Sequence, residues 1–271
     1  MKNRDFIITS LQPWDIEIGS TIKNTALEIS KNNRVLYINT PMDYSTRLRG
    51  NKNKAWTRRM DVIKKQASPI RQINEHMWIA DCPFCVLPVG GLPTTCLFDW
   101  INRINNRKIA DYIRQITTQL NFNNYIHLID TDIYRSQYLK EYLTPSLSIY
   151  YCRDFVIGES YWKKNGVRLE PLLAAKSDIV LANSTHFAER FRQYNRHTFS
   201  IETGVNLALY DGRKKWLIPE DIKPIPHPII GYVGTVNSTR LDSDLLLQIA
   251  EERPVYSFVF TGPEDEVFSQ H

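Results

Sequence analysis

Charged residues follow the apolar segments of this 271-residue chain, and the clearest case is Arg153-Asp154, directly after the apolar run 147–152. A carboxylate at the end of a buried strand can act as a base, orient a substrate or accept a hydrogen bond from a hydroxyl group. An ion pair or a helix cap is the alternative role for the same two residues.

A second pair of carboxylates, Asp130 and Asp132, surrounds Thr131 at the end of another apolar run. Hard oxygen ligands suit Mg²⁺ or Mn²⁺, so a D-x-D at this place could hold a divalent cation against a diphosphate. Asp132 could equally cap a helix that begins after it. Both interpretations remain open from the residues alone.

A third group lies in the segment 231–240, where Gly234 and Thr235 close a strand and a helix is expected after Arg240. Backbone N–H groups at a helix start favour an anion, and Arg240 would add a full positive charge. A tight turn whose glycines only permit close packing is the alternative.

The elements that must position these groups alternate between strands and helices. Apolar runs of strand length cover 4–10, 33–40, 76–81, 124–130, 147–152, 178–183 and 198–203, and helical spacing covers 20–29, 98–120, 169–175 and 185–194, with Ser184 as a candidate N-cap. Near-continuous apolar strands are typical of a parallel sheet that is covered on both faces. The sequence therefore predicts an α/β, Rossmann-like fold with its polar groups at the carboxyl ends of the strands.

A proline-rich stretch, 211–228, interrupts this pattern before a second strand-loop-helix-strand opening begins. We predict an N-terminal domain at 1–210, a linker at 211–228 and part of a second Rossmann-like domain at 229–271. The last range holds 43 residues, whereas an α/β domain usually needs about 100. The expectation is a cleft between two lobes, the second of them incomplete.

The composition and charge of the chain indicate which classes of ligand and which cellular location to expect. A net charge of +5 and a pI near 8.9 are compatible with an anionic ligand but do not indicate nucleic acid. No apolar run is long enough for a transmembrane helix or a signal peptide, so a cytoplasmic location is expected. The segment 47–65 carries eight Lys or Arg against Asp61, and it could contact an anionic membrane surface or form a solvated loop.

The four cysteines include a C-x-x-C at Cys82 and Cys85. Two prolines and a double glycine follow it, so the helix that a redox pair needs is not expected. Cys96 and Cys152 stand alone and complete no zinc site. We therefore predict structural thiols and no metal.

Several segments together resemble the group 1 glycosyltransferases with the GT-B fold. The range 229–263 resembles the start of their C-terminal lobe, and 177–206 resembles an aspartate-strand-serine-helix unit followed by a Gly-Val-Asn turn, here Asp178, Ser184 and Gly204-Val205-Asn206. The segments 10–30, 150–155 and 169–180 are similar to bacterial members that build cell-surface polysaccharide. The resemblance extends over nearly the whole chain.

This resemblance implies a nucleotide-sugar donor, held in the second lobe by Gly234, Thr235 and Arg240. Arg240 stands where the family has a lysine, and Thr235 stands where an arginine is frequent. Positively charged side chains and helix starts would stabilise the departing diphosphate, so neither metal nor cofactor is implied. The acceptor, a glycan or lipid-linked glycan, would bind the first lobe. Asp154 would face the reacting sugar, and the anomeric configuration would be retained.

The loop "SLQPWDIEIGSTIKN", residues 10–24, holds one glycine where a dinucleotide fingerprint has three, which argues against a dehydrogenase. Gly19 and Ser20 would approach the donor diphosphate. Trp14 and Asp15, together with Arg153, would contact the acceptor, because an aromatic face stacks on sugars and carboxylates accept hydroxyl hydrogens. Packing of Trp14 beneath the loop is the alternative.

Two features of the family, a glutamate-bearing donor motif and a final crossing helix, have no counterpart in these residues. We therefore expect a chain cut within its second lobe, with weak or no transfer activity. The alternatives are a non-catalytic α/β protein that binds a glycan or a partner, and a metal-dependent glycosyltransferase that uses Asp130 and Asp132.

Overall fold

The computed structural model describes residues 1–16, 19–50, 53–204, 207, 210–238, 240–266 and 268. The chain divides into two compact units, Met1–Leu207 and Ala208–His271, and each is described by itself.

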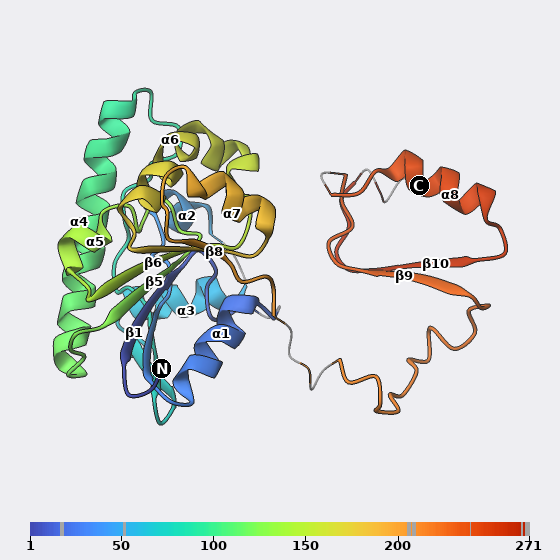
Figure 1. Cartoon of the computed structure of the whole chain (residues 1–271), viewed down its shortest axis with the longest axis horizontal. Coiled ribbons are helices and arrows are strands. Elements are labelled where there is room, and N and C mark those ends of the chain that lie inside the picture. The colour runs from blue at the N-terminus through green and yellow to red at the C-terminus, as the bar shows by residue number, and fades with distance from the viewer. Residues whose placement is uncertain are drawn as a thin grey trace. The chain divides into compact units, whose positions relative to one another are not determined.

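The N-terminal unit is built on an eight-stranded sheet in the order β3-β4-β2-β1-β5-β6-β7-β8 (Figure 1). All neighbouring pairs are parallel except β3 with β4. The strands are β1 (Asp5–Ser10), β2 (Arg34–Ile38), β3 (Ile70–Asn74), β4 (Met77–Ala80), β5 (Ile126–Asp130), β6 (Leu147–Cys152), β7 (Ile179–Ala182) and β8 (Thr198–Ser200). The predicted parallel α/β sheet is thus confirmed, and its short antiparallel edge strand β3 is an addition to it.

Helices connect these strands and cover the sheet. They are α1 (Thr21–Ser30), α2 (Tyr44–Arg49), α3 (Lys54–Ile63), α4 (Thr95–Gln119), α5 (Leu139–Leu143), the 3₁₀ turn η1 (Val156–Gly158), α6 (Ser160–Lys176) and α7 (Thr185–Arg192). Ser20 and Ser184 cap α1 and α7 by accepting the Lys23 and Phe187 N–H groups, as expected for Ser184. None of the helices in the described ranges combines the length and the apolar character that crossing a bilayer requires.

Successive residues of the central strand β1 point to opposite faces of the sheet. Ile7 packs in a cluster with α4 and α5, whereas Phe6 and Ile8 pack in another cluster with Ile22 and Ala26 of α1. Because both faces are covered, the strands are apolar throughout, and polar side chains collect at their carboxyl ends.

The basic segment 47–65 contains the end of α2 and the whole of α3. The apolar side chains of α3 do not face solvent, because Met60 and Trp56 pack with Met42 and Cys85 in a small cluster of their own. Cys82, Cys85 and Cys152 are buried free thiols, and Cys96 is exposed.

The second unit holds β9 (Ile229–Val233), α8 (Ser243–Glu252) and β10 (Ser257–Thr261), with the two strands parallel. The stretch 211–228 forms turns and contains neither helix nor strand. Where the two strands end, Gly262 meets Gly234 so closely that a Cβ on Gly262 would lie 1.8 Å from the Gly234 carbonyl oxygen. This contact requires glycine at 262.

Candidate functional site

The carboxyl end of the N-terminal sheet gathers polar residues from strands that are far apart in sequence. Ser10 of β1 pairs in register with Asp130 of β5, and Asp130 pairs with Tyr151 of β6. Asp130 is fully buried, and its two carboxylate oxygens accept hydrogen bonds from the Ser10 hydroxyl at 2.7 Å and from Arg153 Nε at 3.0 Å. Burial raises the pKa of the Asp130 carboxyl, and the Arg153 guanidinium opposes that rise.

Arg153 joins Asp130 to Asp154 and to the loop after β1. Its Nη1 lies 2.7 Å from Asp154 Oδ2, and its Nη2 donates to Gln12 Oε1 at 3.3 Å. Only 16% of the Arg153 side chain is exposed, whereas 56% of the Asp154 side chain is. Arg153 is thus enclosed by protein partners, while Asp154 presents its carboxylate outward.

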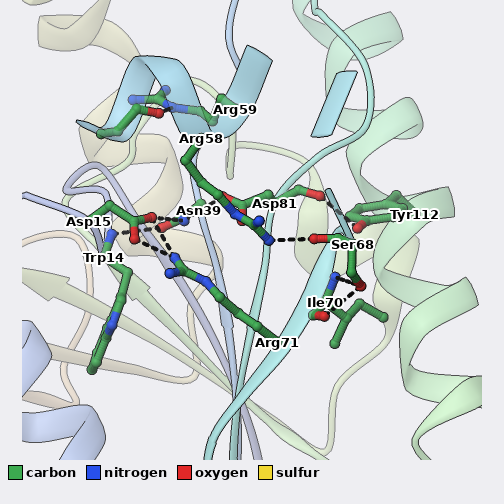
Figure 2. A network of polar contacts seen from close by, with 11 residues as sticks. Trp14, Asp15, Asn39, Arg58, Arg59, Ser68, Ile70, Arg71, Asp81 and Tyr112 are labelled. Atoms are coloured by element: carbon green, nitrogen blue, oxygen red, sulfur yellow. Dashed lines mark hydrogen bonds and ion pairs between the residues drawn. The ribbon is translucent and has the colours of Figure 1, made fainter. Parts of the chain in front are cut away.

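Hydrogen bonds and an ion pair connect the loop that carries Trp14 and Asp15 to Asn39, which follows β2, and to Arg71 of β3 (Figure 2). Arg71 Nη2 lies 2.5 Å from both oxygens of Asp15, and Asn39 Nδ2 donates to Asp15 Oδ2 at 3.2 Å. Asn39 Oδ1 also accepts the Trp14 backbone N–H at 2.7 Å. The Trp14 ring packs edge-on against Tyr37, which corresponds to the packing alternative for that residue.

Behind this loop lies a buried carboxylate that sequence reasoning missed. Asp81 is fully buried and accepts hydrogen bonds from Asn39 Nδ2 at 2.7 Å and Arg58 Nε at 3.1 Å (Figure 2). Asn39 and Asp81 directly follow β2 and β4, so the strand-end rule that selected Asp130 and Arg153 also applies to them. Arg58 and Arg71 carry no such signal in the sequence.

Gly19 and Ser20 stand at the start of α1. Ser20 is its N-cap, and its hydroxyl accepts the Lys23 N–H at 3.3 Å. A Cβ placed on Gly19 would meet no atom within 4 Å. The fold of the N-terminal unit therefore does not require glycine at 19.

The pair Asp130 and Asp132 has protein partners on both carboxylates. Asp132 Oδ1 accepts the Arg135 backbone N–H at 3.2 Å, and α5 begins only at Leu139, so Asp132 closes a turn and not the predicted helix. Burial raises the pKa of the Asp132 carboxyl too. Within the described ranges, no three His, Cys, Asp or Glu side chains are grouped as a metal site would need.

In the second unit, Gly234 and Thr235 directly follow β9, and two residues, Leu241 and Asp242, separate Arg240 from α8. The start of α8 is occupied by its own carboxylates, because Asp242 accepts the Leu245 N–H at 3.1 Å and Asp244 lies in the first turn. Two negative charges at that helix start reduce its attraction for an anion, and the donor contacts of Gly234, Thr235 and Arg240 stay predictions. The Gly-Val-Asn turn at 204–206 lies partly outside the described residues, since only its Gly204 belongs to them.

No family profile matches the sequence, and no curated protein sequence is significantly similar to it. Solved structures do match. One is Anabaena Alr3699/HepE in complex with UDP and glucose, with a TM-score of 0.56 and 13% identity over 99% of this chain. Another is the sucrose-phosphate synthase of Thermosynechococcus elongatus, with a TM-score of 0.53 and 10% identity over 96% of this chain.

Both are glycosyltransferases with the GT-B fold. The chain has the GT-B fold. It spans 63% of the HepE chain and 71% of the synthase chain. At these identities the likeness establishes the fold, and the predicted site residues remain predictions.

Proposed function

We propose that this chain belongs to a glycosyltransferase that moves a sugar from a nucleotide-sugar donor to a glycan or lipid-linked glycan. The observation that carries the proposal is Asp154, an outward-facing carboxylate held by Arg153 at the carboxyl end of a GT-B sheet. Ligands of open α/β sheets bind at that end. HepE, which shares the fold, was solved with UDP and glucose.

In this proposal Asp154 contacts the reacting sugar or the incoming hydroxyl, and Arg153 positions it. Asp130 fixes Arg153 in turn, because it holds the guanidinium from the buried side. The donor diphosphate would be contacted by Gly19, Ser20, Gly234, Thr235 and Arg240. Trp14 and Asp15 would then support the acceptor side mainly by shaping their loop, since Asp15 is already bonded to Arg71 and Asn39.

The proposed reaction is retaining and independent of metal. The Asp130 oxygens are shared between Ser10 and Arg153, and a guanidinium beside a carboxylate disfavours a divalent cation there. Transfer that is insensitive to EDTA is the expected result, and restoration of activity by Mg²⁺ or Mn²⁺ alone would revive the Asp130 and Asp132 alternative.

Calorimetry with a panel of nucleoside diphosphates tests the donor side directly. One member of the panel should bind the chain, and Arg240→Gln should weaken that binding about 10-fold through the loss of a charge-assisted contact. Arg213→Gln is the matched control, because Arg213 is an exposed arginine that is paired with Asp211 and is not one of the predicted donor residues. Absence of binding by every nucleotide in the panel would favour the non-catalytic binding protein.

We also propose that the protein works in the cytoplasm, at the inner face of the membrane. Support comes from α2, where Leu48 is 86% exposed and lies between Arg47 and Arg49. An exposed leucine flanked by arginines suits an anionic bilayer surface. Flotation with phosphatidylglycerol vesicles should fall in Leu48→Ser and not in Leu217→Ser, a leucine that is 97% exposed and lies outside the segment 47–65. Equal flotation of both variants contradicts the membrane contact.

A further inference from the structure

Arg59 is a half-buried arginine that forms no direct ion pair with a carboxylate of the described residues. It projects from α3, and its guanidinium donates to two backbone carbonyl oxygens, Ala55 at 3.1 Å and Thr40 at 3.2 Å. Among the residues that the structure describes, no acidic side chain forms an ion pair with it. A partly buried cation without a direct ion-pair partner is costly, so its presence calls for an explanation.

Arg135 approaches the same place from the segment after β5. Its side chain is 19% exposed, and its Nη1 lies 3.8 Å from Asp132 Oδ1, too far for a hydrogen bond. Thr40 links the two arginines, because its carbonyl accepts Arg59 and the residue lines a small cavity together with Arg135. Burial first, and repulsion from Arg135 second, lower the pKa of Arg59, whereas attraction to Asp81 and Asp15 opposes the shift. The net lowering fits two like charges in proximity.

The nearby acids are already engaged. Asp81 is bonded to Arg58 and Asn39, and Asp15 is bonded to Arg71 and Asn39 (Figure 2). Asp132 lies beside Arg135, so each of these three carboxylates already has an arginine partner. Within the described part of the chain, the Arg59 guanidinium is therefore not taken up by a direct ion pair.

We propose that Arg59 and Arg135 form a subsite for a phosphate or carboxylate group of the acceptor. That the ligand is an acceptor rests on the proposed function; that it is an anion rests on the two arginines. Guanidinium groups bind phosphate and carboxylate through paired N–H donors, and they do so best where water is partly excluded. The alternative is purely structural, with Arg59 tying α3 to Thr40.

The experiment measures thermal unfolding and calorimetric binding of the full chain with inorganic pyrophosphate. It uses an Arg240→Gln background, so that the predicted diphosphate contact of the other unit does not contribute. Pyrophosphate should raise the Tm, because a ligand that binds only the native state stabilises it. Arg59→Met and Arg135→Met should each weaken pyrophosphate affinity about 10-fold.

Arg114→Met is the control, since Arg114 is an exposed arginine of α4 paired with Asp111. It should leave pyrophosphate affinity unchanged. The Tm of unliganded Arg59→Met should equal or exceed that of the parent, because the variant removes a partly buried charge that has no direct ion-pair partner. Unchanged anion affinity in both the Arg59 and Arg135 variants overturns the proposal, as does a lower Tm in Arg59→Met together with unaltered affinity.

Parallel titrations with glucuronate, with glucose as the neutral control, identify the source of the anion. Tighter pyrophosphate binding points to a phosphate-bearing acceptor, and tighter glucuronate binding to an acidic sugar. If neither anion binds, the subsite is wrong. Transfer assays are scored separately, so that failure of transfer removes the proposed function without altering the result for the two arginines.

Discussion

Asp15 and Asp154 occupy comparable places in the N-terminal unit, yet their carboxylates differ in solvent exposure and in the number of bonds to protein groups. Each carboxylate lies beside an arginine at the carboxyl end of the sheet. The Asp15 side chain is 15% exposed and is bonded to Arg71 through both oxygens and to Asn39, whereas Asp154 is 56% exposed with Arg153 as its ion-pair partner. Only Asp154 retains oxygens that a ligand could approach.

The difference lies in the second partner of each arginine. Arg153 is held by the fully buried Asp130, so that it would keep its place even without Asp154. Arg71 comes from the edge strand β3, and its Nε is buried with no hydrogen-bond partner among the described residues, so Asp15 is the group that fixes it. Asp15 therefore has a structural role, because it holds Arg71 in place. Asp154 can serve a ligand, because Arg153 is already held by Asp130.

The strongest test of this contrast is Arg153→Met. The variant leaves the Asp130 carboxylate buried without its cationic partner. Removal of one partner from a buried ion pair lowers the free energy of unfolding by about 3–5 kcal/mol. Urea unfolding followed by tryptophan fluorescence reports mainly on the N-terminal unit, which holds five of the six tryptophans. Asp130→Asn combined with Arg153→Met should recover part of the loss; a loss below about 1 kcal/mol in the single variant would mean that Asp130 does not depend on Arg153.

Asp154→Asn should have the next largest effect, on transfer and not on stability. The substitution keeps the shape and removes the charge, so whatever transfer rate the chain supports should fall about 100-fold. Its free energy of unfolding should change by less than about 0.5 kcal/mol, because an exposed ion pair contributes little. Radiolabelled donor and urea unfolding measure the two quantities, and Asp111→Asn on α4 is the exposed control. A stable Asp154→Asn protein with full activity removes Asp154 from the site.

The sequence predicted the strands well because burial on both faces makes them apolar from end to end. It predicted Arg153 and Asp154 for a related reason, since polar residues directly after such strands collect at one end of the sheet. It could not predict that Arg71 would engage Asp15, because β3 has a mixed polar pattern and joins the sheet only through β4. The spacing of Gly234 and Arg240 does not reveal that Asp242 caps α8, so the helix cap was not foreseen, while the donor contacts of these residues stay predictions.

Arg71→Met should have a smaller effect than Arg153→Met. The pair that it breaks is partly exposed, and the variant also removes the unpartnered Arg71 Nε, so a loss of about 1 kcal/mol is expected, between the values for surface and buried pairs. Urea unfolding measures it, with Arg114→Met as the exposed control. If Arg71→Met lowered the free energy of unfolding as much as Arg153→Met, the proposed difference between the two arginines would be wrong.

Gly19→Val should change stability least, and for that reason it isolates ligand binding. Open space surrounds the position that a Cβ would occupy, and Ser20 continues to cap α1, so the free energy of unfolding should stay within about 0.5 kcal/mol. If the backbone at 19 approaches the donor diphosphate, the valine side chain should hinder that approach and weaken nucleotide affinity, measured by calorimetry. Asp15→Asn, four residues earlier in the same loop, should leave nucleotide affinity nearly unchanged. A larger loss of nucleotide affinity in Asp15→Asn than in Gly19→Val would show that the loop binds the donor through Asp15. Asp15 would then belong to the binding site and would not be purely structural.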